Sequence, residues 1–230
     1  MTSTQLQCIF LCCATLILPS FSLAKNLTHS SATVNVSEGD VTSKFNDTEP
    51  ELAVSGSTIH TLWIAEEPSP RTTAVYYRRS KDNGVTWEKR VRLFADPELE
   101  TATFYVYKRL VVDANNVVHI GLANYGADSG GWFGQLLYLR SADGGTTWEA
   151  PKVISRGDNS YYPYEVRSST NGSKTTIGIK YQHKFSATVL YRLLTTSDGG
   201  KTFAEVTAFT GSESCLVADM KRTLDRAYVL

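Results

Sequence analysis

The chain has 230 residues, with 23 Lys or Arg and 23 Asp or Glu, so its formal net charge is zero. A balanced charge means no excess of basic residues for binding phosphates, which argues against nucleic acid as a partner. Residues 1–24 carry no charged side chain, so removal of this segment would leave the balance unchanged.

The N-terminal segment has the pattern of a secretory signal peptide. It is apolar from Leu6 to about Leu18, and Ser22 and Ala24 are small residues with the spacing that signal peptidase accepts. The sequence therefore predicts cleavage after Ala24 and a secreted location, extracellular or periplasmic. Because the α-amino group is the only positive charge before the apolar run, an uncleaved anchor is the alternative, and membrane contact is expected only in that case.

Residues 25–49 form a polar leader that precedes the first strand-like run. The leader holds three Asn-x-Ser/Thr sequons, and a fourth lies further along the chain. If the chain passes through a eukaryotic secretory pathway, these asparagines are expected to carry glycans. They are Asn26, Asn35, Asn46 and Asn171.

From residue 50 onward the chain consists of short runs rich in β-branched and aromatic residues, bounded by Gly, Asn, Asp and Ser. This pattern predicts strands, and no long helical period interrupts it, so the predicted fold is all-β. The runs fall into three groups of four. They span 51–55, 58–65, 74–79 and 86–93; then 109–113, 117–124, 135–140 and 147–154; then 164–168, 175–181, 188–195 and 202–209.

One motif occurs three times, between the third and fourth run of each group. The copies span residues 80–87, 141–148 and 196–203, and each reads Ser/Thr-x-Asp-x-Gly-x-Thr-aromatic. Glycine accepts the positive φ of a tight turn, and a short Asp side chain accepts hydrogen bonds from nearby backbone N–H groups. We therefore interpret each copy as a hairpin fastened by its aspartate, with the aromatic residue starting the next strand and packing beneath the turn. Repetition at nearly regular intervals indicates a repeat architecture.

The motif resembles the Asp-box, or bacterial neuraminidase repeat, of sialidases, sortilin-type receptors and many non-catalytic secreted propellers. The resemblance covers about residues 50–230 and implies that each repeat is one four-stranded blade of a β-propeller. In that family the box is a structural turn on the face opposite the usual ligand site. The residues to which the resemblance gives this structural role are Asp82, Gly84, Trp87, Asp143, Gly145, Trp148, Asp198, Gly200 and Phe203.

The resemblance predicts a sialidase-type β-propeller of about three and a half blades, and hence a fragment of a six-bladed propeller. The expected blades span about residues 50–107, 108–160 and 161–212, and residues 213–230 form an incomplete fourth with strands at 214–220 and 226–230. Residues 33–36 alternate in polarity. They are either an outer strand that completes the last blade or part of a flexible leader.

Loops on the face opposite the boxes gather aromatic rings, carboxylates and amides. This mixture suits sugar binding, because rings stack on the C–H face of a sugar while polar groups bind its hydroxyls. Packing of the rings between blades is the alternative for each single residue. The candidate binding residues are Glu66, Glu67, Arg71, Tyr105, Tyr107, Asp128, Trp132, Tyr161, Tyr162 and His183.

The catalytic machinery that the sialidase resemblance would require is missing from this sequence. The first arginine of sialidases lies in a Phe/Tyr-Arg-Ile-Pro motif before the first box, where this chain has residues 47–54 without such a motif. The remaining arginines, the tyrosine nucleophile and its glutamate belong to later blades. We therefore predict no catalytic residue. The histidines show no metal-ligand spacing and no phosphate loop is present, so no metal and no cofactor are expected.

The leading hypothesis is a secreted, non-catalytic Asp-box propeller that binds a glycan or a protein through the face opposite its boxes. The first alternative is a truncated sialidase-like exo-glycosidase whose catalytic residues lie beyond Leu230. A sortilin-type receptor ectodomain is a third, and it would require a downstream cysteine-rich module and a transmembrane helix.

Overall fold

The computed structural model describes residues 34–37, 48–68, 71–95, 105–128, 131–158, 160–212, 220–222 and 227–229. The chain divides into two compact units, Met1–Val34 and Asn35–Leu230, and every described strand lies in the second. The predicted signal peptide and the sequon asparagines Asn26 and Asn46 lie outside the described residues. No helix of the described part is long and apolar enough to cross a membrane.

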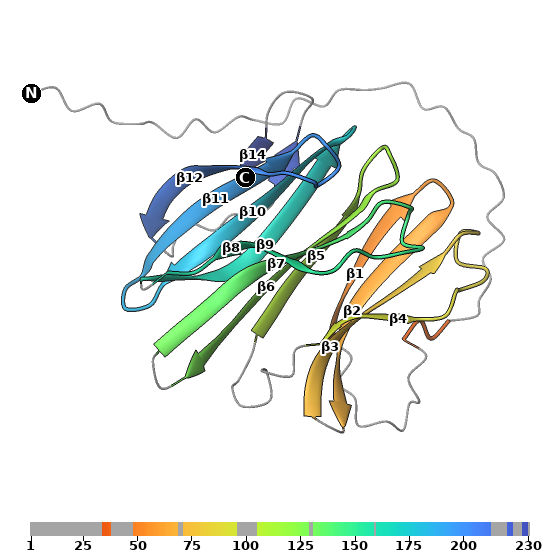
Figure 1. Ribbon diagram of the computed structural model, residues 1–230, viewed down its shortest axis with the longest axis horizontal. Helices are drawn as coiled ribbons and strands as arrows, with labels where there is room; N and C mark the ends of the chain where they lie inside the picture. Colours follow the sequence, from red (N-terminus) through yellow and green to blue (C-terminus); the bar gives the residue numbers. More distant parts are fainter. Residues whose placement is uncertain are drawn as a thin grey trace, which may run out of the picture. The chain divides into compact units, whose positions relative to one another are not determined.

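The second unit contains three four-stranded antiparallel sheets that follow one another along the chain (Figure 1). The first sheet consists of β1 (Thr48–Ser55), β2 (Thr58–Pro68), β3 (Arg71–Ser80) and β4 (Val91–Ala95). The second consists of β5 (Tyr105–Val112), β6 (Val118–Asp128), β7 (Gly131–Ser141) and β8 (Lys152–Arg156). The third consists of β9 (Tyr161–Asn171), β10 (Lys174–His183), β11 (Thr188–Thr196) and β12 (Ala204–Ser212). Within each sheet the strands pair in chain order, so the described residues confirm the all-β class and the three groups of four.

The last strand of each sheet begins later than the sequence predicted. The aromatic residue of the box precedes the strand instead of starting it, since β4 begins at Val91 and β8 at Lys152. After the first box, Glu88 N–H donates to the carbonyl of Arg79 (2.9 Å), and Glu149 N–H does the same to Arg140 (2.9 Å). The pairing of β3 with β4 and of β7 with β8 also shows a register shift. The shifted register delays regular pairing by several residues.

Two further expectations fall at the ends of the sequence. Residues 36–37 form a turn and none of residues 34–37 is in a strand, so of the two alternatives for residues 33–36 the outer strand is not found among the described residues. Of the strands predicted at 214–220 and 226–230, the second is found as β14 (Ala227–Val229), which pairs with β13 (Met220–Arg222), and residues 214–219 lie outside the described residues.

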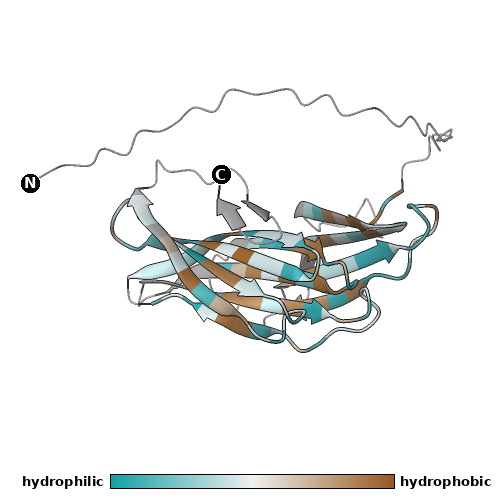
Figure 2. Cartoon of the chain, turned by 90° about the horizontal axis from the view of Figure 1, so that it is seen from above, coloured by the Kyte–Doolittle hydropathy of each residue, from teal (hydrophilic) through white to brown (hydrophobic). Residues whose placement is uncertain are grey.

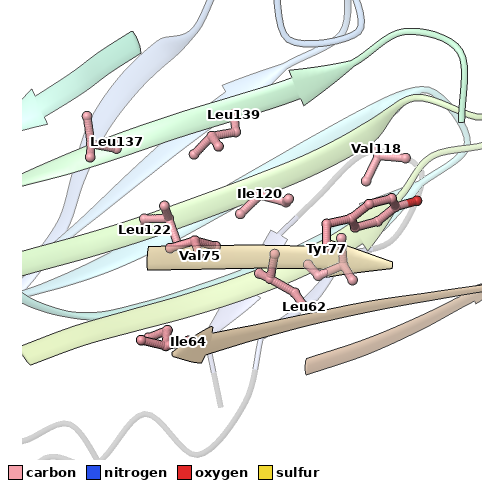
Figure 3. Close-up of a cluster of buried hydrophobic side chains, with 10 residues drawn as sticks. Leu62, Ile64, Val75, Tyr77, Val118, Ile120, Leu122, Leu137 and Leu139 are labelled. Atoms are coloured by element: carbon pink, nitrogen blue, oxygen red, sulfur yellow. The ribbon is translucent and has the colours of Figure 1, made fainter. Parts of the chain in front are cut away.

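Apolar side chains from neighbouring sheets form two separate cores. In the first core, Leu62, Ile64, Val75 and Tyr77 of the first sheet face apolar residues of β6 and β7 (Figure 3). The second core lies between the second and third sheets and includes Leu136, Tyr138, Ile177 and Ile179. Along the strands, apolar and polar residues alternate (Figure 2), as expected for sheets that bury side chains against a neighbour. The packing therefore fixes the sheets side by side in chain order.

Candidate functional site

The three Asp-box turns share one hydrogen-bond pattern around the aspartate carboxylate. Asp82 accepts hydrogen bonds from the Thr86 N–H (2.8 Å), the Thr86 hydroxyl (2.5 Å) and the Ser80 hydroxyl (2.7 Å). Asp143 and Asp198 accept the corresponding bonds from Thr147 with Ser141, and from Thr202 with Thr196. Each carboxylate is therefore engaged by its own turn.

The box glycines and aromatic residues complete the turn. The N–H of Gly84, Gly145 or Gly200 donates to the preceding Ser or Thr hydroxyl, and all three glycines have positive φ. Hydrogen bonds from Thr86, then from Ser80, lower the pKa of Asp82 to about 2. Hydrogen bonds from Thr202, then Thr196, likewise lower the pKa of Asp198. Groups held ionised in this way suit a structural turn and not a proton donor.

Side chains of one sheet reach into the box of the next, and we call this contact the inter-sheet clamp. In the first sheet the clamp consists of His60, Tyr77 and Arg79. The His60 Nδ1 lies 2.7 Å from the Tyr77 hydroxyl, and the Tyr77 ring meets the Trp148 ring edge-on at 4.8 Å. Arg79 donates to the carbonyl of Gly144 and to the Thr146 hydroxyl. The clamp thus joins the first sheet to the second box.

The second sheet repeats this arrangement against the third box. His119 Nδ1 lies 2.6 Å from the Tyr138 hydroxyl, and the Tyr138 ring meets the Phe203 ring edge-on at 4.9 Å. Arg140 donates to the carbonyl of Gly199. Burial raises the pKa of Tyr138 and of Tyr77, so both hydroxyls stay protonated. These six residues were missed by the sequence reasoning, although Tyr-x-Arg directly precedes each of the first two boxes.

The candidate binding residues lie at the opposite end of the sheets, but in strands and not in loops. Glu66, Glu67 and Arg71 belong to β2 and β3, which stay paired as far as Pro68 and Arg71. Asp128 and Trp132 belong to β6 and β7, paired as far as Asp128 and Gly131. The sequence placed these residues in loops, whereas strand pairing in the structure continues almost to the turn. For Glu66, Glu67, Arg71, Tyr105, Asp128 and Trp132 the structure describes the backbone only.

The tyrosines predicted in the connections between sheets also lie in strands. Tyr105 and Tyr107 belong to β5, and Tyr161 and Tyr162 begin β9. Tyr161 pairs with His183, the last residue of β10, so the start of one strand and the end of the next meet here. This correction places the residues on rigid strand ends, where a binding site is more precisely held than on a loop.

Six rings gather at this end of the second and third sheets, and we call them the aromatic end: Tyr107, Tyr161, Tyr162, Tyr164, His183 and Phe185. The Tyr161 and His183 rings meet edge-on at 4.9 Å, and the His183 and Phe185 rings at 6.2 Å. Tyr164 connects the remaining rings, at 5.4 Å from Tyr107 and 6.4 Å from Tyr162. The structure thus brings Tyr161 together with His183, and Tyr107 together with Tyr162 through Tyr164.

The exposure of these rings differs sharply. Phe185 is 83% exposed, whereas Tyr162 is 8% exposed and packs in the interior. Lys180 is 8% exposed, and its ammonium lies 5.4 Å from the centre of the Tyr164 ring. Phe185, Tyr164 and Lys180 were not among the predicted site residues. Of the whole group, Phe185 offers an open ring face to a ligand.

Hydrogen bonds donated by backbone N–H groups hold the exposed part of the aromatic end in place. The Asp158 carboxylate accepts from the N–H groups of Ser160 and Tyr161, both at 2.7 Å. Lys184 N–H donates to the carbonyl of Ser160 (2.8 Å), and Phe185 N–H donates to His183 Nδ1 (3.1 Å). Because Nδ1 is an acceptor here, the neutral His183 carries its proton on Nε2. The turn after β10 and the residues before β9 are thus fastened to each other.

Two of the predicted glycosylation sites, Asn35 and Asn171, lie among the described residues. Asn35 is exposed, and its side-chain oxygen accepts from the N–H (3.1 Å) and hydroxyl (3.0 Å) of Ser37. Asn171 ends β9 and is half-buried. Among the described residues, no cluster of His, Cys, Asp or Glu is arranged to hold a metal ion.

Comparison with known proteins gives a family match and several distant structural likenesses, among them a lyase and a sialidase. A family model described as BNR repeat-like domain matches residues 25–221. An ulvan lyase from a new family of polysaccharide lyases, bound to -[GlcA(1-4)Rha3S]-, is 14% identical with a TM-score of 0.48, over 75% of this chain and 43% of that one. A variant of NanB sialidase from Streptococcus pneumoniae is 11% identical with a TM-score of 0.45, over 71% and 44%. The chain spans less than half the length of either protein. Comparison with curated proteins gives no match.

Proposed function

The chain belongs to the BNR repeat-like family, and we propose that it is a secreted propeller module that binds carbohydrate through its aromatic end. The single observation that carries this proposal is the fastened group of Tyr161, His183 and Phe185. The rings meet edge to face, with centres 4.9 Å apart for Tyr161 and His183 and 6.2 Å apart for His183 and Phe185, and Phe185 is 83% exposed.

The chemistry of this group suits a sugar. An exposed aromatic face stacks on the C–H face of a pyranose, and the neighbouring Nε2–H of His183 and hydroxyl of Tyr161 are suited to hydrogen bonds with sugar hydroxyls. A few placed polar groups beside apolar surface are the usual composition of a small-ligand site. Because hydrogen bonds from backbone N–H groups already fix the turn, binding orders few side chains and costs little entropy.

The other end of the sheets is a poor place for a ligand. There the three aspartates are engaged by their own turns, and Tyr77, Arg79, Tyr138 and Arg140 are occupied by the next sheet. The two structural likenesses are a lyase with a bound glycan and a sialidase, and the proposal for this chain rests on its own residues. Residues 66–67 and 128 are placed at the same end as the aromatic group by the strand pairing.

A glycan array compared between the wild-type chain and Phe185→Ala tests the proposal. Since Phe185 is exposed, its removal should leave the fold intact, and loss of one stacking contact of about 0.5–1.5 kcal/mol should weaken binding about two- to tenfold. Val85→Ala is the matched control, because Val85 is 78% exposed at the box end. Equal binding by all three proteins, or no bound glycan, would refute the assignment. Release of a sugar from an array glycan would instead support the glycosidase alternative.

A further inference from the structure

The turn that follows β10 holds Phe185 through a hydrogen bond to a titratable side chain. The Phe185 N–H donates to His183 Nδ1 at 3.1 Å, and the two rings meet with their centres 6.2 Å apart. Phe185 itself is largely exposed, so little else fixes its ring. The position of this ring therefore depends on an acceptor nitrogen that only the neutral imidazole provides.

The other hydrogen bonds of this turn do not depend on a proton. Lys184 N–H donates to the carbonyl of Ser160 (2.8 Å), and Gln182 Nε2 donates to the carbonyl of Ser186 (3.2 Å). Amide and carbonyl groups keep these roles at every pH at which the protein is folded. Among the described hydrogen bonds of the turn, the bond to the imidazole nitrogen is thus the one that a change between about pH 8 and pH 5 can remove.

A second proton on His183 converts Nδ1 from an acceptor into a donor. Both ring nitrogens of an imidazolium carry a hydrogen, so Nδ1–H and the Phe185 N–H would point at each other. Two donors cannot share a hydrogen bond, and the new positive charge would also lie next to Lys184 in the chain. The imidazolium is therefore incompatible with the turn as it stands, and either the ring or residues 184–186 must move.

Titratable and charged residues lie around His183 in three segments. Tyr161 of β9 meets its ring edge-on at 4.9 Å, and Lys184 follows it in the turn. Asp158 lies before β9, where its carboxylate accepts from the backbone N–H groups of residues 160 and 161, both at 2.7 Å. β11 begins beside this end of β10 with the uncharged residues 188–190. Among the residues described around this turn, no carboxylate is bonded to the imidazole.

We propose that His183 is a pH-sensitive latch, which holds Phe185 in its binding position while neutral and releases the turn and the bound carbohydrate on acidification. This regulation rests on the proposed function, since carbohydrate is the ligand released. The apparent affinity scales with the fraction of protein whose turn is closed. Binding should therefore be weaker at about pH 5.5 than at about pH 7.5, by about two- to tenfold, the factor that one hydrogen bond contributes.

Nuclear magnetic resonance on the chain labelled with 15N at phenylalanine tests the latch without any ligand. The chain has nine phenylalanines, and the Phe185 amide signal is identified by its absence in Phe185→Ala. As the pH falls, the temperature coefficient of this amide proton should grow, because the amide loses its bond within the protein. In His183→Asn it should stay constant, because the asparagine Oδ1 is as far along the side chain as Nδ1 and accepts at every pH.

The glycan array, read at about pH 7.5 and about pH 5.5, tests the coupling to binding. The wild type should lose affinity about two- to tenfold at the lower pH, whereas His183→Asn should bind with similar affinity at both. Burial lowers the pKa of His60 to about 4 and also lowers the pKa of His119. Both buried histidines thus bind a proton at a lower pH than an ordinary histidine, and circular dichroism at both pH values checks that the fold is unchanged.

The two measurements separate the latch from the ligand assignment. A Phe185 amide that does not respond to pH, or that responds equally in His183→Asn, would overturn the latch. Glycan binding by the wild type that stays constant while the amide responds would overturn the regulation. No bound glycan at either pH, together with an amide that responds in the wild type alone, would support the latch and refute the carbohydrate assignment.

Discussion

Removal of the Tyr77 hydroxyl tests whether the inter-sheet clamp stabilises the fold. The Tyr77→Phe substitution keeps the ring and therefore its edge-on contact with Trp148 at 4.8 Å. It removes the partner of His60 Nδ1, which lies 2.7 Å from the hydroxyl, while the His60 side chain stays fully buried. A buried polar atom left without a partner costs about 1–3 kcal/mol. Since a domain of this size loses about 2–4 °C in Tm per kcal/mol, Tm should fall by about 2–12 °C.

Thermal unfolding followed by circular dichroism gives the measurement, and Tyr161→Phe is the control. Tyr161 is half-buried and its ring contact with His183 would remain. The double variant His60→Leu with Tyr77→Phe should recover part of the loss, because removing both partners leaves no orphaned polar atom. If Tyr77→Phe lowers Tm no more than Tyr161→Phe does, the clamp hydrogen bond contributes nothing and the reasoning fails.

Two further predictions follow from the same contacts. Burial first, and then the charge of Arg79, lowers the pKa of His60 to about 4, whereas the unfolded chain binds this proton near pH 6.5. The unfolded state therefore holds more protons between these values, so stability is full above about pH 6.5 and falls on acidification by about 3 kcal/mol at pH 4. The urea midpoint of unfolding, measured between pH 7 and pH 4, should fall in the wild type and should fall less in His60→Gln. An equal fall of the midpoint with pH in both proteins would contradict the prediction. Gly145→Ala should destabilise far more than Gly56→Ala: both glycines have positive φ, but the new Cβ would lie 2.0 Å from the Tyr77 hydroxyl at Gly145 and meets nothing within 4 Å at Gly56. Similar urea midpoints for the two variants would show that the box tolerates the crowding.

The strands were predictable because their signal is local. Alternating β-branched and aromatic residues between turn residues are enough to place β2, β6 and β10. The ends of the strands were not predictable in the same way. The pairing of β2 with β3 continues to Pro68 and Arg71, and how far it continues depends on the partner strand and not on the local sequence. The later start of β4 likewise depends on the register shift opposite Val75 and Tyr76.

The clamp was beyond sequence reasoning for a different reason. Tyr77 and Arg79 look like ordinary strand residues, and their partners lie more than sixty positions along the chain in the next box. Recognition of such a contact requires the stacking order of the sheets, which no local pattern contains. The same holds for the aromatic end, where Tyr107 of β5 and Tyr164 of β9 meet across two sheets at 5.4 Å.

The two ends of the sheets are suited to different tasks because they differ in how many of their side chains are already bonded within the protein. At the box end, each aspartate carboxylate is bonded within its own turn, and each of the two clamp arginines donates to the next box. A ligand arriving there would have to break these bonds before forming its own, which costs the free energy of several hydrogen bonds, of which the two donated by the clamp arginines are buried. At the aromatic end, the open face of Phe185 is covered mainly by water, whose release favours binding. Substitutions at the box end should therefore change stability while leaving ligand affinity unchanged in the folded fraction, and Phe185→Ala should do the reverse.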